Sequence, residues 1–122
     1  MTFLSGDTCG GIIFNMEVSF LTSYSEFFIC TDGSYHLNDV SVLSTSVLQG
    51  YTTMNTGVGQ INVIAVVANG PTINLYINGQ KTNSITFKTT NAGGGTLGLV
   101  VYGQTDKGPA EAAFKDAKVW TF

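Results

Sequence analysis

Charged residues are scarce in this chain: they make up 11% of its 122 residues, against about 25% in an ordinary domain. So few charges do not suit a highly charged disordered segment. The formal net charge of -3 opposes binding to nucleic acid, which needs clustered Lys and Arg. The polar surface must therefore come from Ser, Thr, Asn, Gln and Gly. Such a surface is typical of extracellular β-domains that bind neutral ligands such as sugars.

Long apolar segments are also missing. No run reaches the roughly 18 residues that a bilayer crossing needs. The N-terminus lacks the basic region and apolar stretch of a signal peptide. We expect no membrane insertion by this chain, and an extracellular or cell-surface location whose export signal the chain does not carry.

Residues for catalysis and metal binding are few. The one histidine, His36, is expected to be an outward strand residue, and the two cysteines cannot form a zinc site unaided. No two carboxylates in one strand have the spacing of a glycosidase pair, so we expect a protein that is not an enzyme. Asp32, Asp39 and Asp106 lie in or near turns, where they could gather around Ca²⁺ or, as we favour, cap their own backbone.

The strongest fold signal lies between residues 60 and 80. Ile61–Ala68 is an apolar, β-branched run, and Thr72–Ile77 alternates strictly between apolar and polar residues. Asn78-Gly79 is typical of a two-residue hairpin turn, because both central positions of that turn need φ > 0. This pattern predicts a β-hairpin.

Short strands with turn signals continue along the rest of the chain. They predict one all-β domain over residues 1–122, an antiparallel β-sandwich or jelly roll. Residues 1–8 end in a turn, and Val42–Tyr51 is expected to be an irregular strand or loop rather than a helix. The other expected strands are Gly10–Phe14, Tyr24–Thr31, Ser34–Val40, Asn83–Phe87, Thr96–Tyr102 and a bulged Glu111–Phe122, with Leu97, Leu99 and Val101 sharing one face.

One register would bring the two cysteines together. If Ile12 pairs with Phe27, antiparallel geometry sets Cys9 opposite Cys30. Directly opposed Cβ atoms lie within reach of a disulfide, which would imply an oxidising compartment. Two buried free thiols are the alternative.

The same register groups polar and aromatic residues on one face. It places Asn15 opposite Tyr24 and sets both beside Glu26. Tyr76, on the polar side of its strand, and Tyr102 could join them. Aromatic rings beside amide and carboxylate groups are typical of sugar sites, so these five residues are the candidate ligand-binding set. The alternative is that the tyrosines only cover the outer sheet.

Several segments also resemble concanavalin A-like lectin/glucanase (laminin-G-like) jelly rolls, in the bacterial branch related to the 3-keto-disaccharide hydrolase domain. The resemblance implies a carbohydrate or glycoconjugate-binding module. A structural or protein-interaction module and a hydrolase of sugar derivatives are the alternatives. The segments are Gly6-Asp7, Cys9–Phe14, Phe27–Tyr35, Asn62–Gly70, Ile73–Gln80, Leu97–Val100 and Ala113–Trp120.

Two departures from the family pattern matter. The E-x-D-x-E strand of the glucanases is absent, so glucanase activity is not implied. Family members also have several dozen residues ahead of the point that matches Thr2–Asp7. The resemblance therefore implies a jelly roll without its first strands, whose open sheet edge would favour self-association.

Overall fold

The computed structural model describes residues 1–17, 23–40, 44–86, 96–105 and 108–119. In these ranges the protein is all-β, as predicted. The described part contains no helix with the length and apolarity that a membrane crossing requires. The strands are β1 (Thr2–Phe3), β2 (Thr8–Glu17), β3 (Ser23–Cys30), β4 (Ser34–Val40), β5 (Ser44–Tyr51), β6 (Ile64–Asn69), β7 (Thr72–Ile77), β8 (Gln80–Thr86), β9 (Thr96–Gly103) and β10 (Ala112–Ala113).

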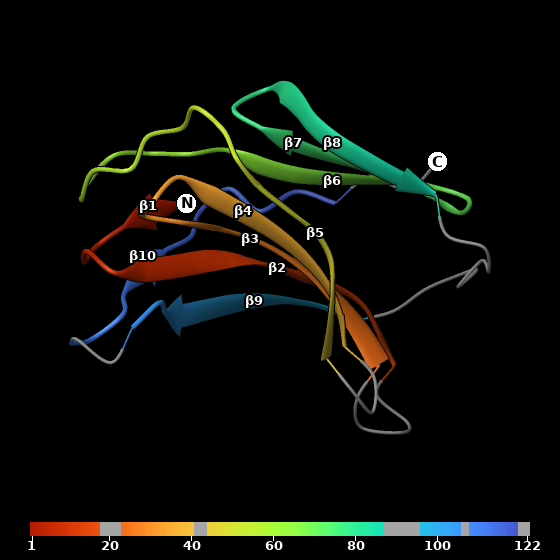
Figure 1. The fold of residues 1–122 in the computed structure, drawn as a ribbon, viewed down its shortest axis with the longest axis horizontal. Coiled ribbons are helices and arrows are strands. Elements are labelled where there is room, and N and C mark those ends of the chain that lie inside the picture. The colour runs from red at the N-terminus through yellow and green to blue at the C-terminus, as the bar shows by residue number, and fades with distance from the viewer. Residues whose placement is uncertain (18–22, 41–43, 87–95, 106–107, 120–122) are drawn as a thin grey trace.

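The strands form a sandwich-like arrangement of antiparallel sheets. The larger sheet has five strands in the order β5-β4-β3-β2-β9, and the smaller has three in the order β6-β7-β8. The two short strands β1 and β10 pair with each other. Figure 1 shows the three-stranded sheet lying over one side of the five-stranded sheet. Figure 1 also shows that the larger sheet is curved, with its concave side facing away from the smaller sheet.

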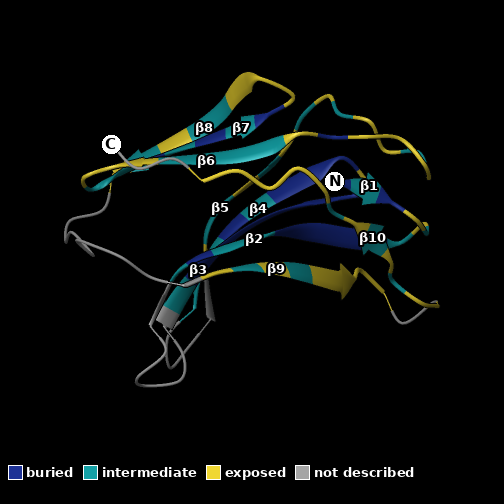
Figure 2. Cartoon of the chain, turned by 180° about the vertical axis from the view of Figure 1, so that it is seen from behind, coloured by how far each residue is buried: buried dark blue, intermediate teal, exposed yellow. Residues whose placement is uncertain are grey.

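Alternating side chains from both sheets build the core between them. Along β7 every second residue is buried, as the alternation in the sequence predicts. Full burial of one such aliphatic side chain stabilises the fold by about 1.5–3 kcal/mol. Asn83 Nδ2 on β8 also donates a hydrogen bond of 3.1 Å to the Tyr35 hydroxyl on β4, which links the two sheets. Figure 2 shows the buried residues along β3, β4 and β7; the core includes Phe27, Ile29, Leu37, Ile73, Leu75 and Ile77.

The hairpin between β7 and β8 turns at Asn78-Gly79. Both residues have positive φ, 53° and 80°, as a two-residue hairpin turn requires. The Asn78 side chain accepts a hydrogen bond from Val63 N and donates one to Asn62 Oδ1. Asn62 is fully buried and also holds Asn55 through both ends of its amide. The turn therefore anchors the segment that leads into β6.

Gly79→Ala is expected to lower the free energy of unfolding by about 1 kcal/mol, because a Cβ at positive φ is strained. Nothing lies within 4 Å of the new methyl group, so the loss would come from the backbone alone. Gly6→Ala is the matched control, since its methyl group also meets nothing within 4 Å and its φ is not in the left-handed range. Urea denaturation measures both, and equal losses would contradict the turn assignment.

Strand β9 departs from the sequence-based picture. Leu97, Leu99 and Val101 share one face as predicted, but Leu99 is 55% exposed and the other two are also exposed. Strand β9 is the outermost strand of its sheet. Its described side chains contribute none of the residues of the main core. The alternation identified the face correctly but did not show that the smaller sheet leaves it uncovered.

Other predicted elements also need correction. Over the described residues, the predicted closing strand Glu111–Phe122 reduces to β10, since residues 114–119 form no strand and Val119 is exposed. Trp120 lies outside the described residues. Ser44–Tyr51 is a strand, β5, and its pairing with β4 shifts register between Leu37 and Asn38, so the predicted irregular strand is confirmed and the loop alternative is not. Its Ser and Thr residues suit an edge strand, where neighbour pairing outweighs their local preference for loops.

Candidate functional site

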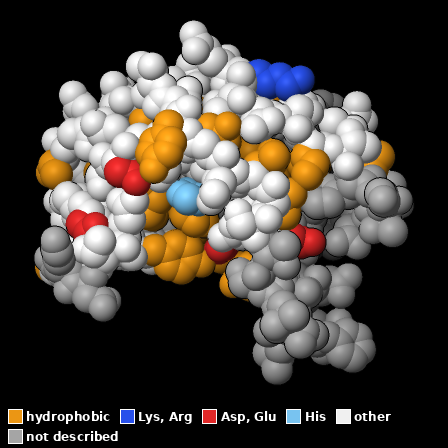
Figure 3. Space-filling view, in the orientation of Figure 1, with side chains coloured by type: hydrophobic (Ala, Val, Ile, Leu, Met, Phe, Trp, Pro, Cys, Tyr) orange, Lys and Arg blue, Asp and Glu red, His pale blue; other side chains and the backbone are white. Residues whose placement is uncertain are grey.

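The outer, concave face of the five-stranded sheet carries the candidate site. Core residues Phe27 and Leu37 point toward the smaller sheet, so their neighbours in β3 and β4 point the opposite way. The outward set includes Glu26, Phe28, His36 and Asn38. Figure 3 shows the single histidine in the middle of this view among apolar side chains, with acidic groups nearby and a basic side chain at the upper edge.

Glu26 stands at the centre of this face. Although it lies on the outer side of a sheet, its side chain is only 4% exposed. The Tyr102 hydroxyl donates a hydrogen bond of 2.6 Å to Glu26 Oε2, and Asn38 Nδ2 donates one of 2.9 Å to Oε1. The carboxylate is thus held from two sides by residues of the neighbouring strand β4 and the more distant strand β9.

Aromatic rings surround this carboxylate. The Phe28 and His36 rings stack, with centroids 4.8 Å apart and planes 13° from parallel. Phe28 also meets Tyr102 edge to face at 5.5 Å. These contacts fix the rings in orientation. Tyr102 remains 38% exposed, so one aromatic ring of the group is open to a ligand.

The close approach of Phe28 to β2 depends on a glycine. Gly11 is the partner of Phe28 in the β2–β3 register. A Cβ at Gly11 would lie 2.0 Å from the Phe27 carbonyl oxygen and 2.5 Å from Phe28 Cα. Any larger residue at position 11 would therefore push β2 and β3 apart and displace Phe28 from its contacts with His36 and Tyr102.

The surroundings of Tyr102 change its acidity. Burial, the hydrogen bond to Glu26 and the negative charge of Glu26 raise the pKa of the Tyr102 hydroxyl, and the nearby Tyr24 adds to the effect. The phenol therefore stays protonated, and acts as the donor to Glu26, throughout the neutral range.

In an alkaline titration we expect one tyrosine to ionise well above the usual pKa of about 10. Because its folded pKa is raised, stability is unaffected below that usual value and falls as the pH rises past it. The ultraviolet difference spectrum of tyrosinate measures the titration. Tyr102→Phe should remove the late step, and a late step that persists in this variant would contradict the assignment.

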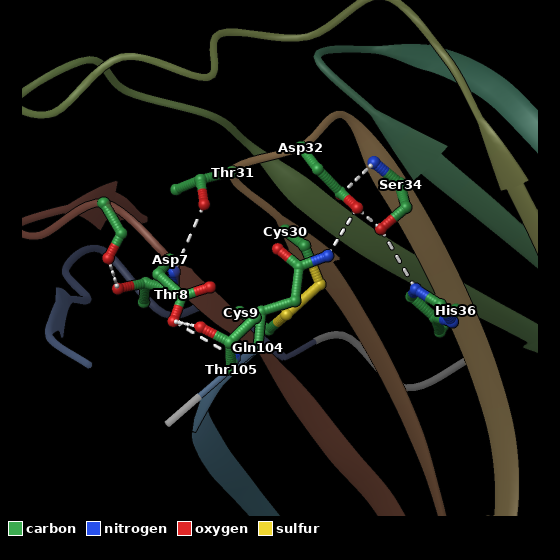
Figure 4. Close-up of a disulfide and its surroundings, with 11 residues drawn as sticks. Asp7, Thr8, Cys9, Cys30, Thr31, Asp32, Ser34, His36, Gln104 and Thr105 are labelled. Atoms are coloured by element: carbon green, nitrogen blue, oxygen red, sulfur yellow. Dashed lines mark hydrogen bonds between the residues drawn. A yellow bond between two sulfur atoms is a disulfide. The ribbon is translucent and has the colours of Figure 1, made fainter. Parts of the chain in front are cut away.

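A series of hydrogen-bonded polar side chains forms one rim of the site, where β3 turns into β4. Asp32 Oδ1 accepts hydrogen bonds from the Ser34 backbone N, at 2.8 Å, and from Ser34 Oγ, at 2.5 Å. His36 Nε2 lies 3.0 Å from the same Oγ. Gln104 Nε2 donates to Asp32 Oδ2 from the end of β9. Figure 4 shows these hydrogen-bonded side chains beside the Cys9–Cys30 disulfide.

This rim is not a nucleophilic triad. The single hydroxyl proton of Ser34 points to the Asp32 carboxylate, so Ser34 Oγ must accept a hydrogen bond from the N–H of His36 Nε2. His36 therefore cannot act as a base toward Ser34. Burial lowers the pKa of His36, partly offset by Asp32, so the ring is neutral at pH 7. Burial raises the pKa of Asp32, but the hydrogen bonds from Ser34 and Gln104 outweigh burial, so the pKa of Asp32 lies below its usual value.

The structure contains the Cys9–Cys30 disulfide. The register around it is the predicted one, with Ile12 opposite Phe27. Both half-cystines are buried, and they form a small outer cluster with Phe28 and Val100. The disulfide thus joins β2 to β3 at the end of the candidate site where the polar rim lies (Figure 4).

The structure brings together three of the five predicted ligand-binding residues. Glu26 and Tyr102 are hydrogen-bonded, and Tyr24 lies near Tyr102. Tyr76 lies on β7, on the side of the smaller sheet that faces away from its buried neighbours, so it is separate from the others. Asn15 is not paired directly with Tyr24 as predicted: the register shifts between Phe14 and Glu17, and Asn15 has a φ of 54°.

Sequence reasoning missed Phe28 and Asn38 as members of the site. Both could have been found from alternation and register, because Phe28 has the parity of Glu26 and Asn38 is the partner of Glu26 across β3 and β4. His36 lies on the outward side of its strand, as predicted. Its contact with Phe28 follows from the same register.

The sequence left two roles open for Asp32, Asp39 and Asp106, which are Ca²⁺ binding and capping of their own backbone. Within the described ranges, no three His, Cys, Asp or Glu side chains gather as a metal site would require. Asp32 caps its own turn through Ser34 N. Asp39 accepts a long hydrogen bond of 3.5 Å from Ser25 Oγ. Asp106 lies outside the described residues.

Comparisons with known proteins place this geometry in no named group. No protein-family model matches the sequence, and no curated protein or solved structure matches it significantly.

Proposed function

We propose that this protein is a non-catalytic carbohydrate-binding module of the concanavalin A-like jelly-roll type, and that its ligand site is the concave face around Glu26 and Tyr102. The single observation that carries the proposal is the open Tyr102 ring, which is hydrogen-bonded to a fixed carboxylate. Sugar rings bind through their C–H faces against aromatic rings and through hydroxyl groups to amides and carboxylates.

The arrangement of the polar groups supports binding rather than turnover. Glu26 and Asn38 are held in place by hydrogen bonds, so a ligand would meet groups that are already ordered. Both Glu26 oxygens accept hydrogen bonds from neutral donors, and the Ser34 hydroxyl is directed at Asp32. Neither side chain is arranged as an activated nucleophile. The disulfide supports an oxidising, extracellular location for the module.

A glycan array with three proteins tests the proposal. Wild-type protein is expected to bind a subset of oligosaccharides, and Tyr102→Ala is expected to lose at least about ten-fold in affinity, the effect of removing one good stacking contact. Tyr76→Ala is the matched control, because it removes the same ring from the outer side of the other sheet. It should bind like the wild type.

Three results would overturn the proposal. Binding to no glycan, together with capture of a specific protein, would favour the structural or protein-interaction module. Hydrolysis of a bound sugar derivative that disappears in Glu26→Gln would favour the hydrolase. Equal losses in Tyr102→Ala and Tyr76→Ala would show that the concave face is not the site.

A further inference from the structure

The charges of this protein are divided unevenly along the chain. All five basic residues lie beyond residue 80, while five of the eight acidic residues lie within the first 39. The strands of the larger sheet, β2, β3, β4, β5 and β9, contain no Lys or Arg at all. The candidate site therefore lies on a sheet that supplies negative charge and no positive charge.

The lack of positive charge on the larger sheet affects Glu26 most. Its side chain is more than nine-tenths buried, and its two hydrogen-bond donors, Tyr102 and Asn38, are both neutral. A buried carboxylate is costly unless it is paired, and neutral donors replace only part of the lost hydration. The sheet offers no cation that could complete the pairing.

The groups over Glu26 suit a cation from outside. The faces of tyrosine and phenylalanine rings attract ammonium groups, and the attraction grows when a carboxylate lies behind the ring. Tyr102 contacts Glu26 through its hydroxyl and Phe28 through its ring. Burial keeps the pKa of His36 low, so the neighbouring ring brings no competing positive charge at pH 7.

We infer that the concave face prefers a ligand that carries a protonated amine, namely an amino sugar with a free amino group, over neutral and acidic sugars. The amine would lie against the Tyr102 ring, with Glu26 as its counter-charge, while sugar hydroxyl groups meet Asn38. This inference rests on the proposed function and specifies the class of sugar. Acidic sugars are disfavoured because Glu26 and Asp32 border the same face.

Calorimetric titration with four oligosaccharides of equal length tests the preference. They are a glucosamine tetrasaccharide, its N-acetylated form, cellotetraose and a tetragalacturonate, all used at pH 7, where His36 is neutral. We expect the affinity for the glucosamine tetrasaccharide to exceed that for cellotetraose by at least about ten-fold. Acetylation should remove that advantage, and the galacturonate should bind most weakly.

Two variants and a matched control locate the effect. Glu26→Gln keeps the shape of the side chain and removes its charge. This variant should bind the glucosamine tetrasaccharide and cellotetraose with about equal affinity. Glu111→Gln is the matched control: Glu111 is exposed and lies just before β10, outside the five-stranded sheet. It removes the same net charge and should keep the preference. A thermal melt of Glu26→Gln checks that the variant is folded, and Tyr102→Leu removes the ring and should also abolish the preference.

The outcomes separate this inference from the proposed function. If glucosamine and cellotetraose bind equally, and Glu26→Gln changes neither, the amine preference is wrong while carbohydrate binding stands. If Glu111→Gln loses the preference as Glu26→Gln does, the effect is one of net charge and the assignment to this site is wrong. If none of the four oligosaccharides binds, the proposed function fails as well.

Discussion

Leu75→Ala is expected to lower the free energy of unfolding by about 3–5 kcal/mol, because it removes a side chain from between the two sheets and leaves a cavity. Leu75 is completely buried on the central strand of the smaller sheet. Its neighbours in the core come from both sheets, so the cavity cannot close without moving one sheet against the other. Urea denaturation monitored by circular dichroism gives the value.

Leu99→Ala is the matched control for that result. It makes the same chemical change on β9, where Leu99 is 55% exposed, so we expect a loss below about 1 kcal/mol. A large loss at Leu99, or a small one at Leu75, would contradict the placement of the core between the sheets.

Removing the disulfide is expected to destabilise the protein by about 3 kcal/mol, the loop-closure value for a bridge over 21 residues. The double variant Cys9→Ala/Cys30→Ala removes the bridge without adding a buried polar group. For a domain of this size the loss corresponds to a fall in melting temperature of roughly 10 °C.

The wild-type protein with and without reductant provides the comparison. The reduced wild type should melt close to the double variant, because both lack the same bridge. Since both half-cystines are buried, reduction should require partial unfolding of the β2–β3 pair. Equal melting temperatures for the oxidised and reduced wild type would contradict a stabilising disulfide.

The hairpin turn at Asn78-Gly79 could be predicted from sequence because it depends on local chemistry. Asn78-Gly79 is a turn whose φ values follow from its residue types. Pairing of Ile12 with Phe27 is one register that the sequence allows; the structure has this register, and it sets Cys9 opposite Cys30. Alternation also identifies which residues share a face within one strand.

Sequence patterns could not show how the sheets cover one another. Leu99 and Leu75 have the same alternating pattern around them, yet one is exposed and the other buried, because β9 is at a sheet edge and β7 is central. For the same reason Tyr76 was grouped with Tyr102 although they lie on different sheets. The register shift after Phe14, which displaces Asn15, likewise depends on pairing with both neighbouring strands.

The most direct test of the central claim, that sugars bind the concave face around Glu26 and Tyr102, is an amide chemical-shift map. Labelled protein is titrated with the glucosamine tetrasaccharide and with cellotetraose. We expect the largest shifts on β3, β4 and β9, at Glu26, Asn38 and Tyr102. Shifts centred on Tyr76 in β7, or no shifts with either sugar, would contradict that claim.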